Sequence, residues 1–385
     1  MTLVPALLSA VALAAAPGMA RAAEKEAPRK VEDLLSGIQQ GDPGLKSIGR
    51  ISMGPAGVLL IADHAGASIV GISTGDTGPL RRLEQPVEDV LDKVAGVLGA
   101  EPGTVSIVDM AVNPASGKVY FSTHRKEGNQ YAIVTVAADG NFDVLDLSDA
   151  NYVRVALPGG EQTKVRNVSG VSFAEDRVLA AGQNNEEFSS KIFSLPLPLK
   201  HGDTASAWST ETYHVAHGRW ETRAPIQSFI PYQEKGENFL VGSFACTPIA
   251  KFPLDDIEAG AKVQGTSVVE LGSGNRPLDM FTYTRDGKEW LVTNTYRFHF
   301  KKNKYGPSKW WGVRVSMDYL AEQEKVNEEA ARRDVKQKAG PNGIEVLEAL
   351  SGAMEVGKLS NDDMVVLRAV NDDEQKLRLE IAPLP

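Results

Sequence analysis

Hydrophobic residues along this chain fall into short runs that repeat one pattern: an apolar strand, a short polar turn and a second apolar strand. Clear copies are KSIGRISM-GPAG-VLLIADH, VSIVDMAV-NPASG-KVYFSTH, VSGVSFA-ED-RVLAAGQ, IQSFIPY-QEKGEN-FLVGSFA and LDMFTYT-RDGK-EWLVTNT, and MEVGKL-SNDD-MVVLRAV is a weaker one. A repeat of roughly 50 to 60 residues with several short strands per copy is typical of a β-propeller. The pattern predicts an all-β fold of six four-stranded blades, with seven as the alternative.

The repeats also predict where the blades begin and end. The first blade takes SIGRISM, VLLIADH and SIVGIST, with PLRRLEQ as a candidate fourth strand, and the other blades follow. We place those at about 105–147, 168–215, 226–271, 278–347 and 354–385. The last blade shows only three strands, so a strand near Val31 is expected to complete it and close the ring, which removes an exposed edge.

Two segments have helical rather than strand character. Residues 87–99 have apolar side chains at helical spacing, with Pro86 near the start and Gly99 just past the end. Residues 319–338 are rich in strong helix formers and carry Glu–Arg pairs four residues apart. We expect both as inserted helices, the second on the outside of the ring.

The N-terminus has the character of an export signal. MTLVPALLSAVALAAAPGMARA is a short apolar run that ends in Ala20-Arg21-Ala22, a small-x-small cleavage pattern. No later stretch approaches the roughly 18 to 20 apolar residues of a spanning helix. We therefore expect a signal peptide at 1–22, an extension or closing strand at 23–44 and one propeller domain at 45–385. The protein would be periplasmic or secreted in a bacterium, without stable membrane insertion.

Net charge and cysteine content limit the classes of partner that can be expected. The chain has 41 basic and 50 acidic residues, a net charge of −9. Nucleic acid requires a concentrated positive face, so it is not expected as a partner. Cys246 is the single cysteine, so no intramolecular disulfide can form. A small molecule or another exported protein is the expected partner.

Aligning the blades on their second strands brings several possible metal ligands to comparable positions. His64 and His124 align strictly, and His299 and Cys246 fall slightly later in their blades. Imidazole and thiolate suit zinc or copper. The alternative is that these are polar residues capping strand ends. His214 and His217 have H-x-x-H spacing at the edge of the third blade.

The loops that enter the blades supply a second candidate site, for an anion. Guanidinium groups can hold a carboxylate or phosphate through two hydrogen bonds. The alternative is that each arginine pairs with a neighbouring acid such as Asp279, which itself is expected to have a structural role at the start of the fifth blade. The candidate ligand-binding residues are Arg166, Arg223 and Arg276 from these loops, together with Asn184 and Asp63 from the ends of the second strands.

No nucleophile motif is evident. The chain has no G-x-S-x-G elbow, and nothing near Cys246 in the sequence would depress the pKa of its thiol. Catalytic residues therefore stay unassigned.

Longer segments carry a resemblance. ISMGPAGVLLIADH, DMAVNPASGKVYFSTHR, CTPIAKFPLDDIEAGAKVQG and GNRPLDMFTYTRDGKEWLVTN resemble a set of mostly uncharacterised exported bacterial β-propeller proteins, and more distantly the NHL and YVTN-type propellers. The resemblance covers nearly the whole mature chain and implies the fold and export. It transfers no catalytic residue, and residues 298–340 depart most from the pattern.

Three functions remain open on this basis. The first is an exported binding or scaffolding propeller with a small-ligand, anion or protein site at one mouth of the channel. The second is a metal-dependent periplasmic enzyme, a hydrolase, lyase or redox protein that uses copper or zinc. The third is a subunit of an exported complex that docks through the helix at 319–338.

Overall fold

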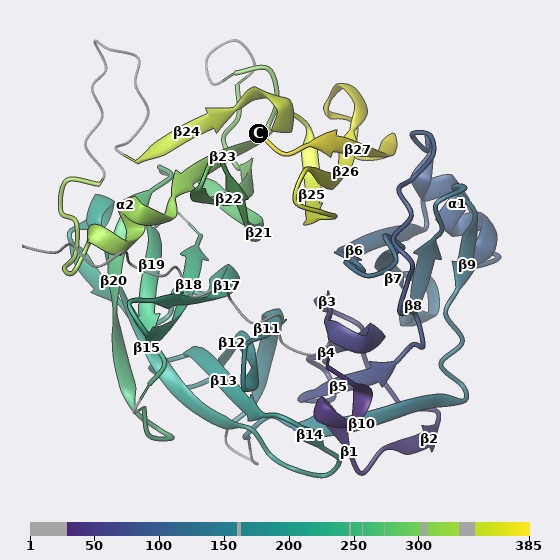
Figure 1. Ribbon diagram of the computed structural model, residues 1–385, viewed down its shortest axis with the longest axis horizontal. Helices are drawn as coiled ribbons and strands as arrows, with labels where there is room; N and C mark the ends of the chain where they lie inside the picture. The colour runs from purple at the N-terminus through teal and green to yellow at the C-terminus, as the bar shows by residue number, and fades with distance from the viewer. Residues whose placement is uncertain are drawn as a thin grey trace, which may run out of the picture.

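The computed structural model describes residues 29–159, 163–245, 248–255, 257–272, 274–301, 306–330 and 343–385. Its strands form the predicted β-propeller, with six blades around one central axis (Figure 1). Blades three and four are joined into one nine-stranded sheet, because their outermost strands pair in parallel.

The blades are numbered in chain order, and each is given from its innermost strand outward. Blade one has β3 (Ile51–Met53), β4 (Val58–Asp63), β5 (Ser68–Ser73), β10 (Ala150–Ala156) and β2 (Gln39–Gly41); blade two has β6 (Val105–Val112), β7 (Val119–Arg125), β8 (Gln130–Val136) and β9 (Phe142–Val144); blade three has β11 (Val165–Phe173), β12 (Arg177–Asn184), β13 (Ser190–Pro196), β15 (Ser206–His214) and the short β16 (Arg219–Glu221). Blade four has β17 (Ile226–Glu234), β18 (Glu237–Phe244), β19 (Pro248–Pro253) and β20 (Lys262–Glu270); blade five has β21 (Asn275–Arg285), β22 (Lys288–Arg297), β23 (Trp310–Ser316) and β24 (Ile344–Leu347); blade six has β25 (Ala353–Lys358), β26 (Asp363–Ala369) and β27 (Leu377–Pro383).

The order of the blades around the ring differs from their order along the chain. The innermost strands of blades one and two are neighbours, those of blades two and six are neighbours, and blade one also contacts blade three (Figure 1). The ring therefore runs one, three, four, five, six, two and back to one. After blade two the chain returns through β10 to the outer side of blade one before it begins blade three.

The hydrophobic core follows this ring. Among the described residues it divides into six clusters, one at each interface between neighbouring blades. In β4, Val58 and Leu60 face blade three whereas Leu59 and Ile61 face blade two. Because side chains of a strand alternate between its two faces, the continuous apolar runs of the sequence supply both interfaces at once.

Two strand assignments from the sequence were wrong. The segment PLRRLEQ forms no strand, and β10 takes the fourth place in blade one by pairing with β5. The expected closing strand does not join blade six, which has three strands; the N-terminal β2 instead pairs with β10 on blade one. The short β1 (Leu35–Ser36) pairs with β14 (Leu199–Lys200) near blade three.

The first predicted helix is confirmed as α1 (Val90–Val97), which packs on β6, β9 and β27. It ends in a Schellman motif: Gly99 has a φ of +60° and donates to the Gly96 carbonyl, and Ala100 donates to the Ala95 carbonyl. The second helix is much shorter than predicted, because α2 covers only Met317–Glu322 and residues 323–330 are not helical. The remainder of that prediction, 331–338, lies outside the described residues.

The predicted signal peptide at 1–22 also lies outside the described residues and stays a prediction. Within the described part of the chain, no helix is long and apolar enough to cross a membrane.

Candidate functional site

Each innermost strand is irregular at the same level of the channel. In five blades the pairing between the first and second strands shifts by one residue, twice in blade three, which marks a β-bulge or a similar irregularity. Blade one has the same feature, because Gly49 donates to the Ala62 carbonyl while Ala62 donates to the Arg50 carbonyl. A bulge bends its strand and re-aims the next side chain, so six equivalent positions meet around the axis.

The residues at these positions form what we call the channel ring. In the order of the blades around the axis they are Arg50, Asp109, Glu355, Asp279, Ser228 and Gly170. The four charged side chains occupy four consecutive blades, and the two small residues occupy the other two. One side of the ring is therefore filled by charged groups and the other is left open.

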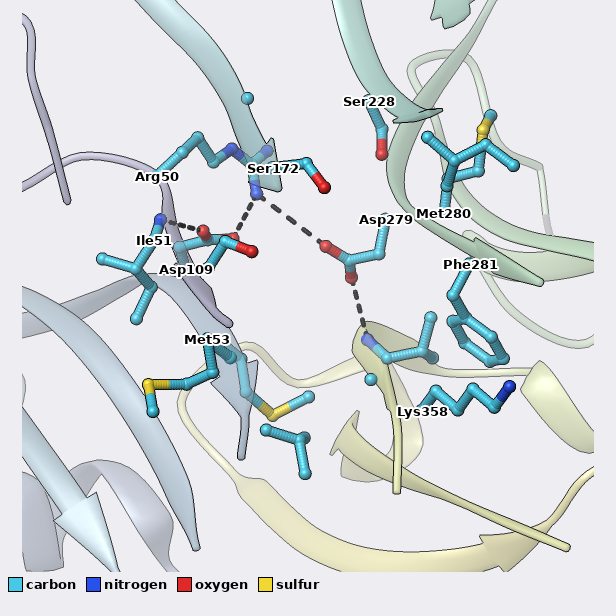
Figure 2. Close-up of a pocket in the computed structure, with 18 of the residues that line it drawn as sticks. Arg50, Ile51, Met53, Asp109, Ser172, Ser228, Asp279, Met280, Phe281 and Lys358 are labelled. Atoms are coloured by element: carbon cyan, nitrogen blue, oxygen red, sulfur yellow. Dashed lines mark hydrogen bonds and ion pairs between the residues drawn. The ribbon is translucent and has the colours of Figure 1, made fainter. Parts of the chain in front are cut away.

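Arg50 is the centre of the charged side (Figure 2). Its Nη1 lies 2.5 Å from Oδ1 of Asp109, and 3.9 Å from carboxylate oxygens of both Asp279 and Glu355. One guanidinium therefore faces three carboxyl groups, whose oxygens lie within 4.8 Å of one another. The positive charge of Arg50 cannot balance all three acids, because three ionised carboxylates around one guanidinium leave a net charge of −2.

The two aspartates also hold the backbone of the neighbouring blade. Asp109 accepts a hydrogen bond from the Ile51 amide at 2.7 Å, and Asp279 accepts one from the Val356 amide at 2.8 Å (Figure 2). Both amides directly follow a bulge. Each aspartate thus supplies a partner for a buried donor on the inner edge of a strand, where no further strand pairs with it, which is a structural role.

Glu355 has no such backbone role. Its Oε2 is buried and has no hydrogen-bond partner among the described residues, although it faces Arg50 at 3.9 Å. A buried carboxylate oxygen that lacks a partner costs free energy comparable to a lost hydrogen bond. Of the three acids, Glu355 is therefore the one that holds no backbone of a neighbouring blade, and its side chain hydrogen-bonds to Asp279 instead.

Burial raises the pKa of all three carboxyl groups. The pKa of Asp279 rises to about 7, because burial and the charge of Asp109 outweigh Arg50 and the Val356 amide. Burial and the charge of Asp279 raise the pKa of Glu355 well above its usual range. Burial also raises the pKa of Asp109, against the opposing effect of Arg50. Asp109 has the closest contact with Arg50, so we assign the ion pair to Asp109 and a shared proton to Asp279 and Glu355.

All members of the channel ring except Glu355 line a cavity of about 670 Å³ that runs along the axis. Its walls extend from the bulges past the ends of the innermost strands, toward the turns that lead to the second strands. The cavity combines hydroxyl groups, apolar side chains and one lysine. Ser172, Ser228, Met53, Phe281 and Lys358 line it (Figure 2). Ser52 and Met110 line it as well.

The structure places the predicted metal ligands apart from this cavity. His64 contacts the Ser47 hydroxyl through Nδ1 at 3.0 Å, and His124 contacts Asn129 at 2.9 Å and stacks on Tyr131. Among the described residues, neither they nor His299 join a group of three candidate ligands. Cys246 lies outside the described residues, so a metal site that includes it stays a prediction.

The predicted ligand-binding residues do not lie together in a described pocket either. Asp63 is fully buried and ion-paired with Arg154 at 3.1 Å. Asn184 donates to Glu186, Arg223 to the Glu187 carbonyl, and Arg276 to the Gln227 side chain. Arg166 is exposed. Arg276 does not pair with Asp279, which faces Arg50 instead.

Sequence reasoning missed Arg50, Asp109 and Glu355, and it assigned Asp279 a purely structural role. A signal was present, because a charged residue followed by Ile, Met or Val recurs at Arg50-Ile51, Asp109-Met110, Asp279-Met280 and Glu355-Val356. Aligning the blades on their first strands rather than their second would have found it.

No family model matches the chain. No curated protein matches it either. Solved structures similar to it include the PQQ-bound aldose sugar dehydrogenase of Streptomyces coelicolor, with 14% identity over 92% of this chain and 100% of that one and a TM-score of 0.35. A lignostilbene dioxygenase of Pseudomonas brassicacearum shares 10% identity over 87% of this chain and 69% of that one, with a TM-score of 0.38. A streptogramin B lyase shares 10% identity over 90% of this chain and 97% of that one, with a TM-score of 0.29. Such low identities and TM-scores assign no activity to this chain.

Proposed function

We propose that this protein is a small-molecule binding propeller whose site is the channel ring, and that its ligand presents an amine or another hydrogen-bond donor to Glu355. The observation that carries the proposal is the group of three carboxyl groups around one guanidinium at a cavity of about 670 Å³: Asp109 and Asp279 line the cavity, and Glu355, whose buried Oε2 has no hydrogen-bond partner among the described residues, belongs to the same group. Burying three carboxyl groups around one guanidinium costs free energy of folding. Two of the three, Asp109 and Asp279, accept hydrogen bonds from backbone amides of a neighbouring blade. The remaining acid, Glu355, has an oxygen, Oε2, that can accept a hydrogen bond from a ligand.

The charge of the ring favours a cation. With Asp109 paired to Arg50 and one proton shared by Asp279 and Glu355, the ring carries a net charge of −1 near neutral pH. An ammonium group held by Glu355 and Asp279 would neutralise this charge and displace the shared proton. Ser228 and Gly170 leave room on the other side of the ring, and Met53, Met110 and Phe281 provide apolar contact for the body of the ligand.

The test compares amines with neutral molecules of equal size. Thermal unfolding and calorimetric titration of the intact protein with a panel of primary amines and diamines, against alcohols of the same chain length, would identify the preferred class. We expect at least one amine to bind, and its affinity to fall at least tenfold in Glu355→Gln. Glu237→Gln, an exposed acid in blade four, is the matched control and should leave binding unchanged.

Two results would reject the proposal: no amine stabilises the protein, or Glu355→Gln binds it as well as the wild type. Tighter binding above pH 7 than at pH 5 is also expected, because the shared proton has left the pair at the higher pH.

A second candidate is a divalent cation held by the same three acids, which is what the metal-dependent enzyme hypothesis would require here. Their oxygens are close enough to share an ion. An all-oxygen set suits calcium, magnesium or manganese rather than the copper or zinc expected from the histidines. Arg50 opposes this, because its guanidinium lies within 4 Å of all three acids. Calcium and magnesium titrations on the same variants distinguish the two candidates.

A further inference from the structure

A second group of possible ligands lies outside the channel, at the outer end of blade three. β15 ends at His214, a single 3₁₀ turn (Val215–His217) follows, and β16 then folds back to pair with β15. This hairpin brings His214, His217 and Glu221 together, with the H-x-x-H spacing produced by the turn. Neither the channel ring nor its cavity includes these residues.

The three side chains face one another. Nδ1 of His214 lies 3.2 Å from Oε2 of Glu221, and Nδ1 of His217 lies 2.9 Å from Oε1 of the same carboxylate. The two imidazole rings are 4.2 Å apart between centroids. Ligand atoms at about 2.0 to 2.2 Å from a tetrahedral zinc ion lie about 3.3 to 3.5 Å from each other. The two distances between Nδ1 and a carboxylate oxygen, 3.2 and 2.9 Å, lie within about 0.4 Å of that range, each to a different oxygen of Glu221.

The members of this cluster differ in their burial and in their neighbours. His214 is 2% exposed, and its Nε2 is buried without a hydrogen-bond partner. Glu221 is approached by both imidazoles and by Nε of Arg219 at 3.2 Å. Arg219 is 70% exposed and can turn away into solvent.

We propose that His214, His217 and Glu221 form a binding site for a divalent transition metal ion of the zinc class. The ion would lie between the two Nδ1 atoms and the carboxylate, in place of the protons that the imidazoles now donate, and each ring would then carry its proton on Nε2. Two imidazoles and one carboxylate are a ligand set that zinc accepts, with water in the remaining position.

The site would act as a structural cross-link. Its ligands come from β15, the 3₁₀ turn and β16, so the ion fixes the hairpin that ends blade three. The Ala216 amide in this turn donates to Oε1 of Glu270 at 3.2 Å, and Glu270 is the last residue of β20 in blade four. Metal binding would therefore strengthen the edge where blades three and four are joined.

The test uses the intact protein without an affinity tag, so that no added histidines compete. Equilibrium dialysis should give one zinc ion per chain, cobalt substitution should give visible absorption bands, and zinc should raise the melting temperature. His217→Ala is the informative variant, because the His217 ring is 40% exposed whereas replacing the buried His214 endangers folding. We expect zinc affinity to fall at least tenfold in His217→Ala, and also in Glu221→Gln.

Two controls make the outcome specific. His124→Ala removes a histidine from blade two, and Glu355→Gln alters the channel ring; both should bind zinc as the wild type does. Unchanged zinc affinity in a folded His217→Ala variant would overturn the proposal. Loss of zinc binding in Glu355→Gln alone would also overturn it, since the ion would then belong to the channel.

Discussion

Among single residues, the two carboxyl groups that share a proton give the channel ring its pH dependence. Asp279 titrates near 7 in the folded protein, whereas an aspartate in an unfolded chain titrates near about 4. Between these values the folded state binds more protons than the unfolded state, so the free energy of unfolding falls as pH rises from about 4 to about 7 and then levels off. Glu355 contributes in the same direction.

We therefore predict that Asp279→Asn reduces the loss of stability between pH 5 and pH 8. Denaturant unfolding at several pH values measures it, and comparison with the wild type cancels the titration of the other acids. Asp286→Asn is the control: this exposed turn residue has a φ of +52°, which asparagine tolerates. Equal pH dependence in Asp279→Asn and the wild type would contradict the shared proton.

Residues of the ring were hard to find from the sequence, because what distinguishes them is the bulge. The sequence gives no direct sign that Val108 or Met354 is the extra residue of its strand, yet these insertions turn Asp109 and Glu355 toward the axis. The ion pair of Arg50 joins residues far apart in the chain, so only the assembled ring reveals it.

At the level of elements, α1 shows how amphipathic spacing places a helix. Val94 is fully buried in the cluster between blades two and six, whereas Val97, one turn later, is 38% exposed. Val94→Ala removes two buried carbon atoms, worth about 1.6 kcal/mol in transfer free energy before any cavity cost.

We predict that Val94→Ala lowers the free energy of unfolding by about 2 kcal/mol and that Val97→Ala changes it by less than about 0.5 kcal/mol. Denaturant unfolding of both variants measures this, and the shared helix and the identical substitution make them a matched pair. Equal losses would mean that α1 is not anchored on this interface.

The helix predictions show what periodicity can and cannot decide. Residues 87–99 have an apolar face and a stop at Gly99, so the predicted helix forms. Residues 323–330 contain strong helix formers but little apolar surface, and the structured helix ends at Glu322. Propensity without a face to bury is a weak predictor, because most helical stability in proteins comes from packing.

For the whole molecule, the repeat predicts the propeller but not the path of the chain around it. Local hydrophobic patterns specify blades, and every blade interface is apolar, so the pattern does not say which blades are neighbours. The segment 150–156 illustrates the difficulty: it follows blade two in sequence but pairs with β5 of blade one. That return places blade one between blades two and three.

The ring order can be tested by distances between spin labels at exposed turns. In the structure, blades two and six are neighbours, whereas blades two and three are separated by blade one. Labels at Ala115 in blade two and Asp362 in blade six should therefore lie closer together than labels at Ala115 and Glu175 in blade three. All three positions are exposed turn residues at corresponding ends of their blades, and a Cys246→Ser background prevents labelling of the native cysteine.

A ring whose blades followed chain order would reverse the two distances, because blades two and three would then be adjacent and blade one would separate blade two from blade six. Double electron–electron resonance on the two labelled pairs thus decides between the two arrangements. The order of the channel ring depends on the result, since Asp109 lies between Arg50 and Glu355 only if blade two lies between blades one and six.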